Sequence, residues 1–251
     1  MSEQLDSAAY YHIAYRPHSI MNPLDERRLL MMAAQCELRE DSRILDVGSG
    51  NGWSVLQITR EWNCYSTQVD VSEQWTQQAR ELFDEYGLSD RTEIHCMDVR
   101  QFHIEDDSFD LVLCLGTAPL YGGFEGALRT LAGCVKPDGY VIIGEPSMRH
   151  PLPKRYAQYL AMLRWDVLGE RELMHIIDRS GFELLWNLRS TRDEWDIYMS
   201  KQWKAVSDHA RLYPEDEEAH EFLDWVRDEQ EVYLRYQRHW VDWNVMLLRA
   251  I

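Results

Sequence analysis

Residues 43–53 read Arg-Ile-Leu-Asp-Val-Gly-Ser-Gly-Asn-Gly-Trp, a short apolar run that ends in three alternating glycines. The apolar residues Ile44, Leu45 and Val47 are typical of a strand that is buried on both faces. The segment 53–60 that follows has the residue spacing of a helix. A strand that turns through glycines into a helix brings bare backbone and a helix N-terminus close to one ligand. The stretch therefore predicts a ligand site at the tip of a buried strand.

The spacing of the glycines indicates which ligand this site takes. A dinucleotide-binding turn needs a small residue at the position of Trp53, because its helix packs tightly on the strand. A pyrophosphate site is therefore disfavoured. The spacing Asp-x-Gly-x-Gly-x-Gly from Asp46 to Gly52 instead resembles motif I of the class I S-adenosylmethionine-dependent methyltransferases, whose glycine backbone lies against the amino-acid part of the cofactor. An ordinary glycine-rich turn between a strand and a helix is the alternative.

The composition is that of a globular protein, and its charge narrows the range of partners. The 251 residues carry a formal net charge of −17 and contain five widely spaced cysteines without a Cys-x-x-Cys pair. Nucleic acid is not an expected partner, because phosphate binding depends on concentrated basic charge. No apolar run approaches the ~20 residues of a membrane span, and no membrane contact, secretory signal, disulfide framework or metal site is expected. The expected compartment is the cytoplasm.

Strand-like and helix-like segments alternate along the chain. Strands are predicted at 44–47, 64–70, 92–97, 109–116, 140–145, 182–188 and 243–249, and helices at 24–38, 53–60, 72–87, about 126–135 and 171–180. The segment 136–139 reads as a turn, and 193–240 reads as a helical insertion that is split at Pro214. Strands that alternate with helices predict a parallel sheet that is covered on both faces.

This order of elements resembles the class I methyltransferase plan over roughly residues 24–251. The resemblance implies an α/β fold with a seven-stranded, mostly parallel, doubly wound sheet whose last strand runs antiparallel beside the fifth. It also implies an N-terminal helical lid and helix at 1–40, and a methyltransferase domain at 41–251 that includes the insertion at about 193–240. The resemblance is specific in the first half of the chain and only topological between residues 149 and 240.

In an open parallel sheet a ligand lies beyond the carboxyl ends of the strands. Asp70 ends the second predicted strand and can accept hydrogen bonds from both ribose hydroxyls of a nucleoside. The resemblance further implies that Val71 packs on the adenine and that Asp98 accepts from its amino group. A lone Asp after a strand is more commonly a turn or a helix cap, so the prediction depends on the joint occurrence of these residues. The predicted S-adenosylmethionine-binding residues are Asp46, Gly48, Ser49, Gly50, Gly52, Asp70, Val71, Asp98, Val99, Leu115 and Gly116.

The methyl acceptor is less determined by the sequence. Residues 114–119, Cys-Leu-Gly-Thr-Ala-Pro, occupy the position of motif IV but lack the Asn/Asp-Pro-Pro-Tyr/Phe signature of enzymes that methylate planar amide or nucleobase nitrogens. Aromatic residues near the N-terminus and in the insertion are candidates to close an acceptor pocket, with plain core packing as the alternative. The candidate acceptor-binding residues are Tyr10, Tyr15, Thr117, Trp195 and Tyr198. If the reaction needs a base, the candidates are Glu145, His12 and His18.

These features lead to one principal hypothesis. The chain is expected to transfer the sulfonium methyl of S-adenosylmethionine to an oxygen, nitrogen or sulfur atom of a small molecule, leaving S-adenosylhomocysteine. Such a reaction needs donor and acceptor held about 3 Å apart in line and shielded from water. A nicotinamide-dependent oxidoreductase and a non-catalytic nucleoside-binding protein are the alternatives, and the sequence gives no indication of the oligomeric state.

Overall fold

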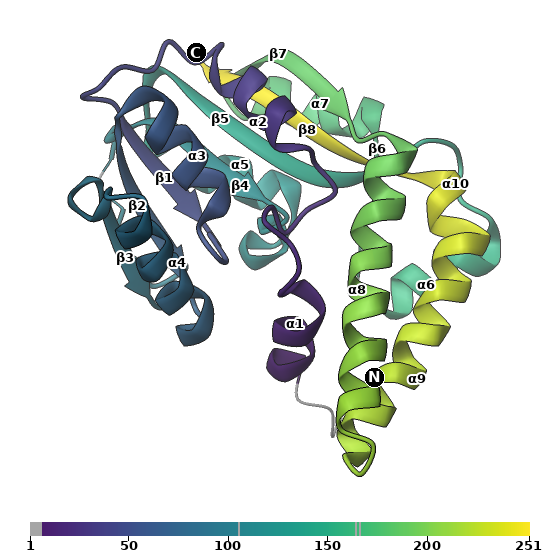
Figure 1. The fold of residues 1–251 in the computed structure, drawn as a ribbon. Helices are drawn as coiled ribbons and strands as arrows, with labels where there is room; N and C mark the ends of the chain where they lie inside the picture. The colour runs from purple at the N-terminus through teal and green to yellow at the C-terminus, as the bar shows by residue number, and fades with distance from the viewer. Residues whose placement is uncertain (1–6, 105, 164, 166) are drawn as a thin grey trace.

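One mixed β-sheet forms the centre of the protein (Figure 1). The computed structural model describes residues 7–104, 106–163, 165 and 167–251. The strands are β1 (Arg43–Val47), β2 (Tyr65–Asp70), β3 (Thr92–Cys96), β4 (Phe109–Leu115), β5 (Val135–Met148), β6 (Leu168–Gly169), β7 (Phe182–Arg189) and β8 (Val241–Ala250). The two-residue strand β6 is the one addition to the seven predicted strands.

The strand order is β3-β2-β1-β4-β5-β8-β7, and β6 pairs with the end of β5. The first five strands are mutually parallel. β8 runs antiparallel to both β5 and β7, which confirms the predicted antiparallel strand beside the fifth. The carboxyl ends of β1, β2 and β4 therefore meet at one edge of the sheet, where the chain order switches from β1 to β4.

Helices cover both faces of the sheet, and two apolar clusters fill the space between them. The helices are α1 (Ser7–Tyr15), α2 (Glu26–Ala33), α3 (Trp53–Trp62), α4 (Glu73–Glu85), α5 (Phe124–Leu131), α6 (Lys154–Met162), α7 (Glu170–Arg179), α8 (Arg192–Leu212), α9 (Glu217–Val232) and α10 (Arg238–Trp240). Residues of α2 and α3 join the cluster on one face, and residues of α5 and α7 join the cluster on the other. The predicted doubly wound arrangement is therefore confirmed.

The helical insertion follows the predicted plan. α8 and α9 form a long antiparallel pair that projects from the sheet, and the chain breaks between them around Pro214 (Figure 1). α1 lies beside α8, so the N-terminal segment is packed on the insertion. A π-helical segment, η3 (Tyr233–Gln237), joins α9 to α10 before β8 begins.

Several local predictions differ from the structure. The helix expected at 24–38 is limited to α2, whose first turn is capped by the Asp25 side chain, an acceptor for the Arg27 amide at 2.9 Å. The turn expected at 136–139 is wrong, because this segment is an irregularity inside β5, where its register shifts against β4. The helix expected at about 126–135 is α5, which begins at Phe124 and ends at Leu131. The sequence analysis missed α6.

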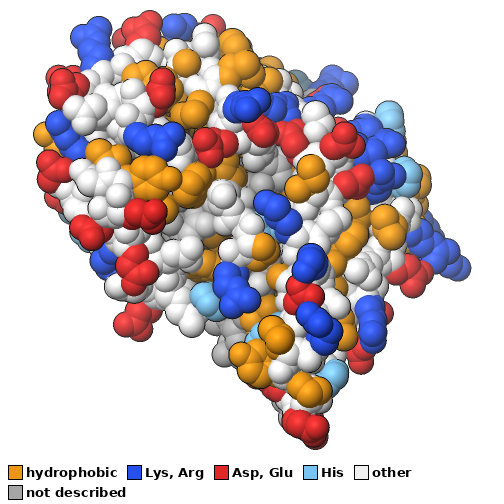
Figure 2. All heavy atoms as spheres, in the orientation of Figure 1, with side chains coloured by type: hydrophobic (Ala, Val, Ile, Leu, Met, Phe, Trp, Pro, Cys, Tyr) orange, Lys and Arg blue, Asp and Glu red, His pale blue; other side chains and the backbone are white. Residues whose placement is uncertain are grey.

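Acidic and basic side chains are interspersed over the face of the molecule that Figure 2 shows. This mixture agrees with the mostly short-range ion pairs on the helix surfaces, such as Arg227 with Asp224 and Arg235 with Glu231. Among the described residues, no helix is long and apolar enough to cross a membrane.

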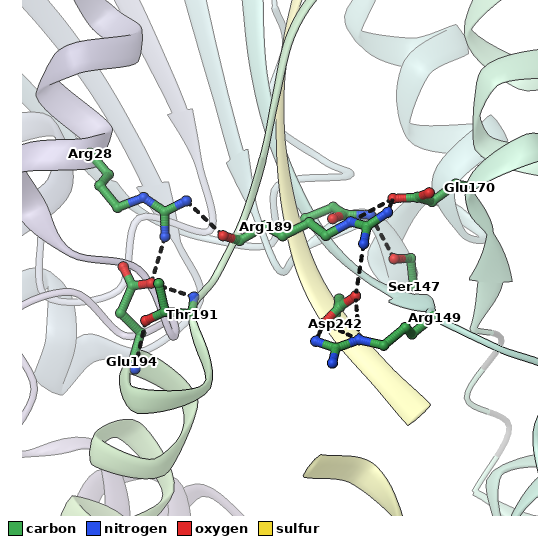
Figure 3. Close-up of polar contacts among 9 residues, drawn as sticks. Arg28, Ser147, Arg149, Glu170, Arg189, Thr191, Glu194 and Asp242 are labelled. Carbon is green, nitrogen blue, oxygen red and sulfur yellow. Dashed lines mark hydrogen bonds and ion pairs between the residues drawn. The ribbon is translucent and has the colours of Figure 1, made fainter. Parts of the chain in front are cut away.

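A network of charged residues joins the insertion to the sheet (Figure 3). The Arg28 guanidinium on α2 donates to Glu194 Oε2 at the start of α8, at 2.5 Å, and to the carbonyl oxygen of Arg189 at 2.6 Å. Asp242 on β8 is buried and pairs with both Arg149 and Arg189. Because these residues come from separate elements, the network fixes the base of α8 relative to β5, β7 and β8.

Candidate cofactor-binding and active site

The glycine bend after β1, residues 48–52, has no room for a side chain at its glycine positions. Gly48 and Gly50 have φ of +70° and +54°, a region that residues with a Cβ rarely adopt. A Cβ on Gly48 would lie 2.2 Å from Thr117 Cγ2, and one on Gly50 would lie 2.6 Å from Met21 Sδ. Other segments therefore approach the bare backbone of the bend closely on two sides.

The Asp70 carboxylate is attached directly to this bend. Its Oδ2 atom accepts a hydrogen bond from the Gly50 amide at 2.8 Å, and its Oδ1 atom accepts from the Ser72 amide at 2.9 Å. Burial raises the pKa of Asp70, and the amides of Ser72, Gly50 and Val71 oppose that shift. Backbone amides thus hold the carboxylate in place, and its remaining lone pairs are free to accept from a ligand.

Two more buried carboxyl groups lie at strand ends nearby. Asp46 in β1 is 3% exposed, and burial, followed by the charge of Asp70, raises its pKa to about 8. Glu145 in β5 is 8% exposed, and burial raises its pKa to about 8 although its Oε1 atom accepts from the Ala118 amide at 3.2 Å. Neither they nor Asp70 form an ion pair with a described lysine or arginine. A cationic ligand would therefore stabilise the ionised forms of these groups.

The adenine-binding residues expected after β2 and β3 lie in different surroundings. Val71 is 74% exposed, so its apolar side chain is accessible to a ligand, whereas Val99 is buried. Both oxygen atoms of Asp98 accept from the Arg100 guanidinium, and this contact lowers the pKa of Asp98 to about 2. An adenine amino group would have to share the Asp98 carboxylate with Arg100.

The segment after β4 closes the bend from the other side. Thr117 Oγ1 donates to the carbonyl oxygen of Val47 at 2.8 Å and lies 3.3 Å from Cys114 Sγ. The Leu115 carbonyl oxygen accepts from Asn22 Nδ2 at 3.3 Å. Burial raises the pKa of the Cys114 thiol to about 12, so this cysteine is a buried thiol rather than a nucleophile.

The chain between α1 and α2, residues 16–25, lies over the bend, and we call it the N-terminal strap. Asn51 Nδ2 donates to the carbonyl oxygens of His18 and Ser19, both at 2.9 Å. The Met21 sulfur packs on Gly50 of the bend, and the Asn22 side chain donates to the Leu115 carbonyl at the end of β4. The sequence analysis missed Asn51, Met21 and Asn22, because no local pattern marks a residue that contacts a distant segment.

The predicted aromatic residues divide between two places. Tyr198 on α8 lies within hydrogen-bond distance of the Tyr15 hydroxyl (3.1 Å) and of the Met21 carbonyl oxygen (3.4 Å). Tyr10 instead packs further along the insertion, against Phe222 and Trp225. Tyr15 and Tyr198 therefore lie beside the strap, whereas Tyr10 is remote from the bend.

Trp195 packs against Trp243 of β8, with ring centroids 6.5 Å apart. The Trp243 ring in turn lies 3.1 Å from where a Cβ on Gly116 would stand. This links Trp195 to the end of β4, where the resemblance implies the transferring methyl.

The two histidines are held by ring contacts. The His18 ring lies 4.9 Å from the Tyr198 ring, and burial, followed by the charge of Lys201, lowers its pKa to about 4. The His12 ring lies 5.0 Å from the Trp75 ring on α4, and burial again lowers its pKa. Both imidazoles are therefore neutral near pH 7, and neither is in hydrogen-bond contact with Glu145 among the described residues.

Several buried polar atoms near the bend, the strap and α8 have no hydrogen-bond partner among the described residues. They include Ser49 Oγ, His18 Nε2, Trp195 Nε1, Trp243 Nε1 and Gln202 Nε2. Buried polar atoms are normally paired, so these atoms leave hydrogen-bonding capacity for a polar ligand. With the bare bend and the acidic strand ends, they fit a cationic nucleoside that carries an amino-acid group. Among the described residues, no group of His, Cys, Asp and Glu is arranged to hold a metal ion.

Comparison with known proteins shows what this chain is similar to. Residues 44–139 match the family described as a methyltransferase domain. The chain is 27% identical over 248 residues to the uncharacterized protein YjhP of Escherichia coli strain K12, a match that covers 98% of this chain and 100% of that protein. It is 26% identical over 179 residues to a glycine/sarcosine/dimethylglycine N-methyltransferase of Actinopolyspora halophila, covering 67% of this chain and 32% of that enzyme.

Solved structures agree with the sequence comparison. A methyltransferase from Geobacter sulfurreducens, crystallised in complex with S-adenosyl-L-homocysteine, superimposes with a TM-score of 0.88 at 27% identity, covering 99% of this chain and 100% of that one. The X-ray structure of YjhP from E. coli gives a TM-score of 0.85 at 27% identity, covering 96% and 99% of the two chains. With its strand order, its glycine bend and its acidic strand ends, this chain has the fold of the class I S-adenosylmethionine-dependent methyltransferases, and its residues 44–139 match a methyltransferase domain.

Proposed function

We propose that this methyltransferase modifies an oxygen, nitrogen or sulfur atom of a small molecule. The bound cofactor supplies a methyl group on a sulfonium, which a lone pair of the acceptor displaces from sulfur. The protein has little covalent chemistry to perform in such a transfer, so its contribution is binding, alignment and the exclusion of water. The net charge of −17 and the interspersed surface charges (Figure 2) favour a small molecule over nucleic acid.

The observation that carries the proposal is the 2.8 Å hydrogen bond between the Gly50 amide and the Asp70 carboxylate. It joins bare backbone, which suits the amino-acid part of the cofactor, to a buried acceptor that suits the ribose hydroxyls. We assign the amino-acid contact to the residues of the bend, Gly48, Ser49, Gly50 and Gly52, with Asp46 beside them, and the ribose contact to Asp70. We assign the adenine contact to Val71, Val99 and Asp98, the last shared with Arg100.

The strap and α8 form the acceptor side of the proposed site. Leu115, Gly116 and Thr117 end β4 beside the bend, and Tyr15, Tyr198 and Trp195 supply the aromatic wall that excludes water. We also propose that residues 1–40 form an N-terminal lid and helix and that residues 41–251 form the methyltransferase domain.

Glu145 is the first candidate for a general base. Burial raises its pKa to about 8, so its ionised form, which can accept a proton, becomes available as the pH rises towards 8. Its carboxyl group is also held by the Ala118 amide immediately after Thr117. His18 is neutral and therefore able to accept a proton, and His12 is the third candidate.

Titration calorimetry with S-adenosylmethionine tests the cofactor assignment. Asp70→Ala removes the proposed ribose acceptor, and Gly50→Arg forces a side chain into the space that Met21 fills. We expect both variants to lose cofactor binding while circular dichroism shows a retained fold. Asp90→Asn, which changes an exposed carboxylate, is the control and should bind like the wild type. Unchanged affinity in both site variants would refute the assignment.

Release of S-adenosylhomocysteine across a panel of small alcohols, amines and thiols tests the reaction itself. Turnover with any member supports a small-molecule acceptor. A protein that binds S-adenosylmethionine but produces no S-adenosylhomocysteine with any acceptor would instead fit the non-catalytic alternative.

A further inference from the structure

A second acidic group lies among aromatic rings, away from the bend. Glu229 on α9 is half-buried, and its Oε2 atom accepts from the Tyr10 hydroxyl at 3.5 Å. Tyr11 of α1, Tyr159 of α6 and Tyr198 of α8 lie near enough for its charge to act on them. Burial is the main cause of the raised pKa of all four phenols, and the Glu229 charge raises each further.

The rings form a continuous wall from Glu229 towards the proposed active site. Centroid separations are 5.8 Å between Tyr10 and Tyr11, 5.5 Å between Tyr11 and Tyr15, and 6.1 Å between Tyr15 and Tyr198. Tyr198 then contacts the carbonyl oxygen of Met21, whose sulfur packs on Gly50. We call Glu229 with Tyr10, Tyr11, Tyr15, Tyr159 and Tyr198 the tyrosine box. Tyr11 is 52% exposed, so the tyrosine box is accessible to solvent where Tyr11 lies.

Glu229 differs from the other acids of α9 in being half-buried, whereas they are exposed. Glu231 pairs with Arg235 and Asp224 pairs with Arg227, whereas Glu229 forms no ion pair with a described lysine or arginine. Burial raises the pKa of Glu229 to about 8, and only the hydrogen bond from Tyr10 opposes this. An uncompensated charge in such surroundings is costly, so a cation beside it would be strongly favoured.

We propose that the tyrosine box binds the organic ammonium group of the methyl acceptor, so that the substrate is a small molecule that carries an amine. Tyrosine faces attract alkylammonium groups through their ring quadrupoles, and a carboxylate adds a charge-assisted hydrogen bond. The ammonium nitrogen bound at Glu229 has no lone pair and does not accept the methyl there. Because Tyr10 is remote from the bend, the acceptor is an elongated molecule: the box anchors its ammonium end, and a different, neutral atom towards its other end reaches the methyl. The link between this ammonium site and methyl transfer rests on the proposed function.

Direct binding tests the ammonium site without any turnover. The probes are 2-phenylethylamine, its uncharged analogue 2-phenylethanol, and tetramethylammonium, titrated calorimetrically into the cofactor-free full-length protein at pH 7. We expect both cations to bind the wild type, and Glu229→Gln to weaken them by about tenfold or more. 2-Phenylethanol should bind the wild type and Glu229→Gln with equal, weak affinity. Glu231→Gln removes the same charge from the exposed face of α9 and should leave all affinities unchanged.

Two results would overturn the inference: no binding of either cation to the wild type at millimolar concentration, or equal binding to the wild type and Glu229→Gln. Glu229→Gln is nearly isosteric, and Tyr10→Phe offers a second variant that retains the charge and the ring and should retain tetramethylammonium binding. S-adenosylmethionine is titrated separately into the wild type and Glu229→Gln. Equal cofactor affinity with lost ammonium binding supports the box, whereas absent cofactor binding in the wild type refutes the proposed function and leaves the ammonium result standing.

Discussion

The carboxyl groups of Asp46 and Glu145 are buried and form no ion pair with a described lysine or arginine. Burial of an ionisable side chain without such a partner is uncommon. Burial is the largest cause of each raised pKa, so the folded protein holds protons that the unfolded chain releases. The proposed cofactor site gives this cost a functional reason, because we assign Asp46 to the contact with the amino-acid part of the cofactor and Glu145 to the proposed base. The same cost makes the stability of the protein depend on pH.

The pH dependence can be assigned to Glu145 by substitution. Its folded pKa of about 8 lies above its ordinary value of 4.5, so its contribution to stability is present below that value and is lost as the pH rises to about 8. We expect urea unfolding of the wild type to show a free energy that falls across this range, by at most about 1.4 kcal/mol per pH unit for one group. Glu145→Gln should flatten the slope, and the exposed Glu85→Gln should not. Asp46 and Glu229, whose pKa values burial also raises to about 8, contribute a slope of their own, so a slope as steep in Glu145→Gln as in the wild type would contradict the assignment.

The contact between Gly48 and Thr117 predicts a rescue by a second substitution. Gly48→Ala places its Cβ 2.2 Å from Thr117 Cγ2 and also strains a φ of +70°, so we expect a loss of about 2–4 kcal/mol in unfolding free energy. Thr117→Ser removes that methyl group but keeps the hydroxyl that donates to the Val47 carbonyl. The double variant should recover part of the loss, measured by a double-mutant cycle in urea. Strictly additive effects would show that the clash is relieved elsewhere.

At the scale of elements, the N-terminal strap between α1 and α2 is the segment that covers the bend, although it forms no helix or strand. It crosses the bend through hydrogen bonds from Asn51 and through Met21, and α8 holds its other side through Tyr198. Asn51 also caps α3, because its Oδ1 atom accepts from the Trp53 amide at 3.1 Å. The Asn51 side chain therefore links the start of α3 to the strap that lies over the bend.

Substitutions of Asn51 separate these two roles. Asn51→Asp keeps the acceptor for Trp53 but loses both donors to the strap, whereas Asn51→Ala loses all three bonds. We expect amide hydrogen exchange of residues 18–22 to become faster in both variants, with a local cost of about 1–3 kcal/mol. Exchange of α3 should become faster only in Asn51→Ala. Strap exchange that stays at the wild-type rate in both variants would argue against the tether.

In the whole molecule, the sheet and the insertion act as one body through the network of Figure 3. Asp242 is 1% exposed and pairs with Arg149 and Arg189, and Arg189 also pairs with Glu170 of α7. Arg28 and Glu194 continue the network to α2 and α8. The proposed acceptor site lies between these parts, so the network sets the distance between the bend and the aromatic wall.

Removal of Arg149 tests this coupling. Arg149→Met leaves the buried Asp242 with a single arginine partner at 3.7 Å, and we expect a loss of about 3 kcal/mol in the free energy of unfolding. Arg227→Met breaks an exposed pair with Asp224 and should change the stability little. Equal small effects in both variants would show that the network contributes no more than a surface ion pair.

The sequence by itself determined the sheet, the bend and the order of the elements. The run from Ile44 to Val47, the alternating glycines and the Ser72 cap of α4 are local features. They depend on interactions between residues that are close together in the sequence. The same applies to the break at Pro214 and to the acidic residues that end β1 and β2. Because parallel strands align their carboxyl ends, these residues meet at one edge without further information.

The tertiary structure alone decided what covers that edge. Asn51 meets the strap, Met21 meets Gly50, and Glu229 meets Tyr10 through contacts between segments that are far apart in the chain. The irregularity in β5 depends on its pairing with the neighbouring strand β4, which periodicity does not reveal. Packing of distant segments selects among many locally acceptable arrangements, and for that reason the walls of the site become visible only in the folded molecule.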